Sequence, residues 1–79
     1  MSSEQIRSIL TTHGRLTVAV DSLGDDSDLY HAGLTSLATV GLMLGLEDEF
    51  DLEFPDSALS RQTFASIESI ADVIEDILE

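Results

Sequence analysis

Hydrophobic residues recur at helical spacing in three parts of the chain, and this pattern predicts an all-α fold. The first helix follows an N-cap at Ser2, whose capping-box partner is Gln5, and Gly14 stops it. Its stripe consists of Ile6, Ile9, Leu10 and His13. The last helix starts near Ser66, with Thr63 as an alternative cap. Its apolar stripe consists of Ile67, Ile70, Ala71, Ile74, Ile77 and Leu78.

The second helix, from about Ser36 to Phe50, has two apolar faces. One face is an ordinary core stripe of Thr39, Leu42, Met43, Leu46 and Phe50. The opposite face begins apolar and ends charged, as Leu37, Gly41, Leu44 and Asp48. Beside it lies a strip with almost no side chain, made of Ala38, Gly41 and Gly45. Either a neighbouring helix packs closely on this strip, or the strip is a docking surface. We favour the second interpretation, since a small domain cannot easily bury both faces.

The segment from Leu16 to Thr35 is predicted to be a long loop between the first two helices, because turn residues fill positions 21–28. Isolated hydrophobic residues attach this loop to the core, namely Leu23, Leu29, Tyr30 and Leu34. The chain leaves the second helix over residues 51–56, because Pro55 disfavours helical geometry at the residue before it. A short helix over Ser57 to Ser60 follows, anchored by Leu59 and then by Phe64. The sequence thus predicts an all-α bundle of three main helices plus one short helix, in a single domain over residues 1–79.

The chain is strongly acidic, with 16 acidic residues against three arginines and a formal net charge of −13. Such a surface repels nucleic acid and anionic membranes, so we expect basic protein partners and neither of those. The absence of cysteine excludes disulfides and thiolate metal sites. The first residues lack the pattern of a secretory leader, and no apolar run approaches the roughly 20 residues of a membrane span. We therefore expect a cytoplasmic protein that is a monomer when it is not bound to a partner.

Ser36 is the residue with the clearest chemical potential, because it lies at the predicted start of the second helix. A hydroxyl in that place caps the helix by accepting a backbone N–H, or it carries an attached group. A phosphate ester there would be stabilised by the unpaired N–H groups and by the positive end of the helix dipole. The residues alone fit a modified carrier and an interaction module equally well.

Enzymatic and metal-binding roles fit the sequence poorly. Catalysis by Ser36 needs a base, and neither His31 nor His13 has a spacing that predicts a hydrogen bond to this serine. Asp26-Ser27-Asp28 begins like a calcium-binding EF-hand loop, but His31 occupies the required glycine position and Leu37 that of the required glutamate. We therefore expect no catalytic residue and no specific metal site.

The chain resembles acyl carrier proteins over nearly its whole length. The resemblance is carried by two runs, Leu29-Tyr30-His31-Ala32-Gly33-Leu34-Thr35-Ser36-Leu37 and Leu46-Glu47-Asp48-Glu49-Phe50-Asp51-Leu52-Glu53-Phe54-Pro55-Asp56. It implies that Ser36 carries 4'-phosphopantetheine, whose terminal thiol holds the cargo as a thioester. It also implies three partners, namely a phosphopantetheinyl transferase, a loading ligase and a downstream transferase.

Departures from the family pattern indicate a subtype. The family usually has an aspartate before the serine, where this chain has Thr35, and acidic residues where this chain has Ala38 and Gly41. The Leu-Thr-Ser-Leu form resembles stand-alone carriers that synthetase-like ligases charge with amino acids. The alternatives are a specialised fatty-acyl or polyketide carrier and, in a different class, an unmodified acidic interaction module in which Ser36 is only a cap. The predicted docking surface comprises Thr35, Leu37, Ala38, Gly41, Leu44, Gly45, Glu47 and Asp48.

Overall fold

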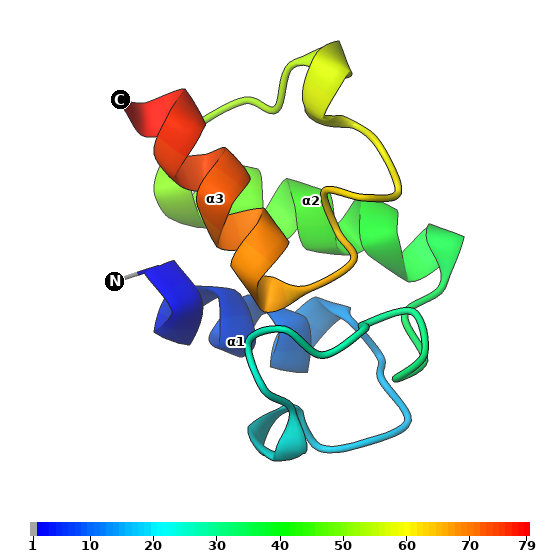
Figure 1. The fold of residues 1–79 in the computed structure, drawn as a ribbon. Helices are drawn as coiled ribbons and strands as arrows, with labels where there is room; N and C mark the ends of the chain where they lie inside the picture. The colour runs from blue at the N-terminus through cyan, green and yellow to red at the C-terminus, as the bar shows by residue number, and fades with distance from the viewer. Residues whose placement is uncertain (1) are drawn as a thin grey trace.

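The computed structural model describes residues 2–79, and it confirms the predicted all-α fold with a long first loop (Figure 1). Its elements, in order, are α1 (Ser2–His13), the 3₁₀-helix η1 (Val20–Ser22), α2 (Ser36–Phe50), the 3₁₀-helix η2 (Asp56–Ala58) and α3 (Ile67–Leu78). The cap predicted for the Ser2 side chain lies outside the described part of the structure. Among residues 2–79, every helix is too short or too polar to cross a membrane.

The core lies where the three α-helices meet, since α1 packs against both α2 and α3 (Figure 1). Each helix contributes large side chains that are at most 1% exposed, and the long loop adds one more. They are Ile6, Leu10, Leu29, Leu42, Leu46, Ile67, Ile70 and Ile74. Fully burying one such side chain stabilises the fold by about 1.5–3 kcal/mol. This cluster therefore sets which face of each helix points inward.

The long loop is fixed to the rest of the chain at several points. Leu29 and Leu34 are buried, as predicted, and the Leu29 N–H donates to the Ala65 carbonyl at 2.8 Å. The N–H and the hydroxyl of Thr17 both donate to the Ala32 carbonyl, at 3.0 and 2.9 Å. Gly33 has a φ of 114°, and a Cβ there would lie 2.9 Å from the Thr17 nitrogen. These contacts fix the path of the chain into α2.

Thr35 determines where α2 begins. Its backbone is extended, and its hydroxyl accepts the Ala38 N–H at 3.0 Å, which satisfies one of the unpaired donors of the first turn. Ser36 is the first helical residue. The alternative in which Ser36 acts as the cap is therefore wrong, because its neighbour already fills that role.

The face of α2 that we predicted as one shallow strip is divided in the structure. Ala38 is only 9% exposed and belongs to the core. A Cβ on Gly45 would lie 2.8 Å from His13 Cδ2 and 2.9 Å from Ile9 Cγ2, so α1 packs closely there. A Cβ on Gly41 would meet nothing within 4 Å. Ala38 is therefore buried, contrary to our prediction, and the alternative of close helix packing holds at Gly45, whereas Gly41 faces open space.

Other local differences concern helix ends. The short helix η2 begins at Asp56, one residue before the predicted start, and Leu59 is 45% exposed, so it does not anchor the helix. Phe64 is buried, as predicted. Ser66, not Thr63, caps α3, because its hydroxyl accepts the Ser69 N–H at 3.0 Å.

Two alanine substitutions at glycines test the division of the α2 surface. Gly41→Ala is expected to raise the free energy of unfolding by about 0.5–1 kcal/mol, because alanine favours the helix and the new Cβ enters open space. Gly45→Ala brings the same propensity gain but forces α1 side chains to shift, which costs about 1–3 kcal/mol. Urea denaturation measures both. Equal stabilisation by the two substitutions would contradict the packing of α1 on Gly45.

A second pair of variants tests the start of α2. Thr35→Ala removes the cap and is expected to lower the free energy of unfolding by about 1 kcal/mol. Ser36→Ala is expected to change it by less than about 0.5 kcal/mol, since the substituted residue is exposed and is not the cap. Thermal unfolding followed by circular dichroism compares them. A larger loss in Ser36→Ala would assign the cap to the serine after all.

Candidate attachment site

The site is built around the exposed hydroxyl of Ser36 in the first turn of α2. Thr35 makes the cap, so the serine is not needed for helix formation. The first turn of α2 contains no acidic residue. A phosphate ester on Ser36 would therefore meet backbone N–H donors and the positive end of the helix dipole without a carboxylate beside it. The residues present fit a covalently attached phosphate group.

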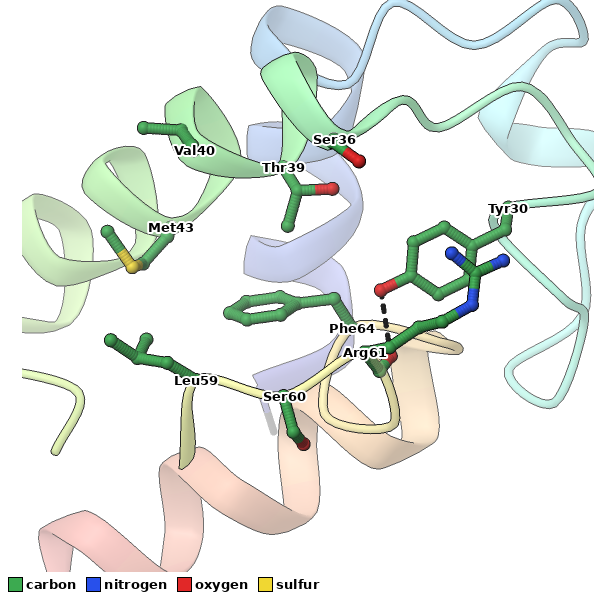
Figure 2. A pocket seen from close by; sticks show the side chains of 9 residues that line it. All are labelled: Tyr30, Ser36, Thr39, Val40, Met43, Leu59, Ser60, Arg61 and Phe64. Carbon is green, nitrogen blue, oxygen red and sulfur yellow. Dashed lines mark hydrogen bonds between the residues drawn. The ribbon is translucent and has the colours of Figure 1, made fainter. Parts of the chain in front are cut away.

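A pocket of about 400 Å³ opens beside Ser36 (Figure 2). Three segments far apart in the sequence form it, namely the first half of α2, the connection between η2 and α3, and Tyr30 of the long loop. Its lining is mostly apolar and consists of Tyr30, Ser36, Thr39, Val40, Met43, Leu59, Ser60, Arg61 and Phe64. A group attached to Ser36 thus starts at the edge of an apolar hollow.

A hydrogen bond and a cation–π contact connect Tyr30 and Arg61 at one side of this pocket (Figure 2). The Tyr30 hydroxyl donates to the Arg61 carbonyl at 2.7 Å, and the Arg61 guanidinium carbon lies 3.9 Å from the centroid of the Tyr30 ring. Partial burial raises the pKa of Tyr30, Arg61 lowers it and Asp28 raises it, with a net upward shift. The phenol therefore remains a hydrogen-bond donor at neutral pH. Sequence analysis missed this pair, because no spacing rule connects residues so far apart.

Within the described residues, the lining of the pocket beside Ser36 contains neither a histidine nor a carboxylate that could act as a general base. His13 packs near Gly45, nine residues further along α2, which is about 13 Å away at 1.5 Å per residue. His31 is exposed, and its backbone N–H donates to the Asp28 carboxylate. Within residues 2–79, no group of three potential metal-ligating His, Asp or Glu side chains lies close together.

The predicted docking residues divide into outward-facing and inward-facing members. Leu37 is 85% exposed and Leu44 55%, with Gly41 open between them. Val40, which the sequence analysis omitted, is 51% exposed on the same face. Its place three residues after Leu37 and four before Leu44 is the periodicity that would have identified it. We name Leu37, Val40, Gly41 and Leu44 the outer apolar face of α2.

The two acidic residues of the predicted docking surface, Glu47 and Asp48 near the end of α2, also differ. The Glu47 carboxylate accepts the Phe54 N–H at 2.9 Å, so it fastens the turn after α2 and is not a free surface charge. Asp51 ends the helix there in the left-handed region, at a φ of 53°. Asp48 is exposed, and Thr35 is exposed beside Ser36 at the other end. Asp48 is therefore the better candidate for an electrostatic contact.

A model of the family described as "Phosphopantetheine attachment site" matches residues 5–74. A curated relative, the aminoacyl carrier protein of Agrobacterium fabrum, is 53% identical over 74 residues, which are 94% of this chain and 89% of the relative. The match thus covers nearly the whole of both chains.

Two solved structures show the same fold. One contains an engineered Bradyrhizobium japonicum glycine:[carrier protein] ligase with the carrier protein from Agrobacterium tumefaciens and ATP. This match has a TM-score of 0.94 and 49% sequence identity, and it covers 98% of this chain and 100% of the matched chain. The other contains the Bradyrhizobium japonicum glycine:[carrier protein] ligase with glycylated carrier protein. This match has a TM-score of 0.78 and 31% sequence identity, and it covers 90% of this chain and 95% of the matched chain. This chain belongs to the phosphopantetheine-dependent carrier proteins.

Proposed function

We propose that this protein carries an aminoacyl group as a thioester on 4'-phosphopantetheine attached to the Ser36 hydroxyl. The observation that carries this proposal is the place of Ser36. It is exposed in the first turn of α2, and it does not cap the helix because Thr35 does. The match to the phosphopantetheine attachment family covers this residue. The phosphopantetheine supplies the terminal thiol that forms the thioester.

The chain's own contribution is to hold the attachment point and to present it. The N–H groups of the first turn of α2 stabilise the negative charge of a phosphodiester on Ser36. The cap by Thr35 and the buried side chains of Leu42 and Leu46 fix the helix that bears it. We propose that the protein catalyses no step itself, because the residues lining the pocket beside Ser36 include neither a histidine nor a carboxylate.

Two relatives support an amino acid as the cargo. The curated relative is named an aminoacyl carrier protein, and the carrier in one solved structure is glycylated and bound to a glycine ligase.

One structural observation favours a second candidate, a specialised acyl carrier. The pocket beside Ser36 is lined mainly by apolar side chains, among them Val40, Met43 and Phe64, which suit an uncharged acyl chain.

We propose that a loading ligase docks on the outer apolar face of α2. Exposed apolar side chains grouped in this way favour contact with a protein partner, and Gly41 lets the partner approach the helix backbone. Asp48 supplies negative charge further along, and the net charge of −13 favours a partner with a basic surface. A phosphopantetheinyl transferase and a downstream transferase are the other proposed partners. We propose a cytoplasmic location, because the ligase bound to the similar carrier protein in the solved structure holds ATP, which is available in the cytoplasm.

Modification of Ser36 is tested by mass spectrometry after incubation with coenzyme A and a phosphopantetheinyl transferase. Wild type is expected to gain the mass of one phosphopantetheine, and Ser36→Ala is expected to gain none, because the acceptor hydroxyl is gone. Ser8→Ala, which removes an exposed serine on α1, is the matched control and is expected to react like wild type. A wild-type chain that stays unmodified, or modification that persists in Ser36→Ala, would overturn the assignment.

Docking is tested by loading rates of the modified protein with glycine and a glycine:[carrier protein] ligase. Gly41→Glu places a long charged side chain in the middle of the outer apolar face and is expected to lower the loading efficiency at least tenfold, since it blocks close approach. Gly41→Ala fills the same position with one methyl group and is expected to change loading far less. Circular dichroism checks that both remain helical. An unchanged rate for Gly41→Glu would argue against docking at this face.

A further inference from the structure

We propose that Arg61, stacked on the Tyr30 ring, binds the phosphodiester of the arm on Ser36 and holds the base of that arm at the pocket. This inference rests on the proposed attachment at Ser36. It assigns a role to a basic side chain in the connection before α3, outside both the attachment residue and the outer apolar face. Ser36 and Arg61 line the same pocket of about 400 Å³ (Figure 2).

Charge is the first argument. The chain has a formal net charge of −13, so a phosphodiester adds a negative charge to a surface that already repels it. The three basic residues that could offset this repulsion are Arg7, Arg15 and Arg61. Arg7 is engaged elsewhere, because its guanidinium contacts Asp25 at 2.8 Å and the Val20 carbonyl at 3.0 Å. Arg15 lines a different pocket, so Arg61 is the arginine placed at the attachment site.

The orientation of Arg61 is the second argument. Stacking on Tyr30 uses the face of the guanidinium and leaves its N–H groups, which lie in the plane, able to donate. The hydrogen bond from the Tyr30 hydroxyl to the Arg61 carbonyl holds the backbone of residue 61 against the same ring. Among residues 2–79, no carboxylate forms an ion pair with Arg61. The planar fork is thus held against the Tyr30 ring with N–H groups that can make a bidentate contact with phosphate oxygens.

Covalent attachment is the third argument. An exposed ion pair between two separate partners contributes little. A phosphate bonded to Ser36 is different, since it cannot leave the neighbourhood of the pocket and its effective concentration there is in the millimolar range or above. Asp28, the acid whose charge raises the pKa of Tyr30, accepts the N–H groups of Tyr30 and His31 through Oδ1 and forms no ion pair with Arg61 among the described residues. The phosphodiester is therefore the anion that Arg61 binds.

Nuclear magnetic resonance of the apo and phosphopantetheinylated protein tests this contact. The chain has three arginines, so the Arg Nε–H region contains three assignable signals. Modification is expected to shift the Arg61 Nε–H and Tyr30 ring signals and to leave the Arg15 Nε–H signal in place. Arg61→Gln is expected to remove at least half of the shift at Tyr30 and to move the phosphorus-31 signal of the arm toward that of free phosphopantetheine. Arg61→Lys, which keeps the charge without the planar fork, is expected to fall between.

Arg15→Gln is the matched control, because it makes the same change in charge at a residue that borders another pocket. It is expected to leave the phosphorus-31 signal as in wild type. An unchanged phosphorus-31 signal in Arg61→Gln, together with the same modification-induced shift at Tyr30 as in wild type, would overturn the role of Arg61 while leaving attachment at Ser36 intact. A wild type that gains no phosphopantetheine mass would overturn both proposals, and the mass spectrum recorded before the resonance experiment distinguishes the two outcomes.

Discussion

The hydrogen bond from the Ala38 N–H to the Thr35 hydroxyl is the interaction on which the site depends. It fixes the residue at which α2 starts, while burial of Leu42 and Leu46 fixes the rotation of the helix about its axis. With start and rotation both set, Ser36 falls in the first turn and on the exposed side. A threonine therefore keeps the capping function where carrier proteins usually have an aspartate, and it does so without a negative charge beside the attachment point.

Three sides of α2 have different surroundings, and its two glycines lie on two of these sides. At Gly45 the missing side chain lets α1 approach, which contributes to the fold. At Gly41 it leaves the surface open between Leu37 and Leu44, which suits a partner. A third side faces Tyr30 and the connection before α3 and forms the pocket beside the attachment point. One helix of 15 residues thus takes part in the core, the proposed docking face and the proposed attachment site.

The sequence predicted the three helices and the place of Ser36 at the start of α2, because apolar periodicity and cap residues are local in the chain. It misplaced Gly45, since a residue without a side chain gives no sign of what packs against it. It treated Glu47 as a surface charge, because the bond to a backbone N–H seven residues on depends on how the chain turns after α2. Tyr30 and Arg61 meet only through the tertiary fold, so local patterns could not have linked them.

We propose that Ser36 bears a phosphopantetheine arm loaded with an amino acid. This proposal is tested by mass spectrometry of the protein isolated from its native cells, before and after hydroxylamine cleavage of thioesters. We expect a fragment containing Ser36 that bears phosphopantetheine plus an aminoacyl mass, of which cleavage removes only the aminoacyl part. A fragment bearing a fatty-acyl or polyketide mass, or an unmodified Ser36, would contradict it.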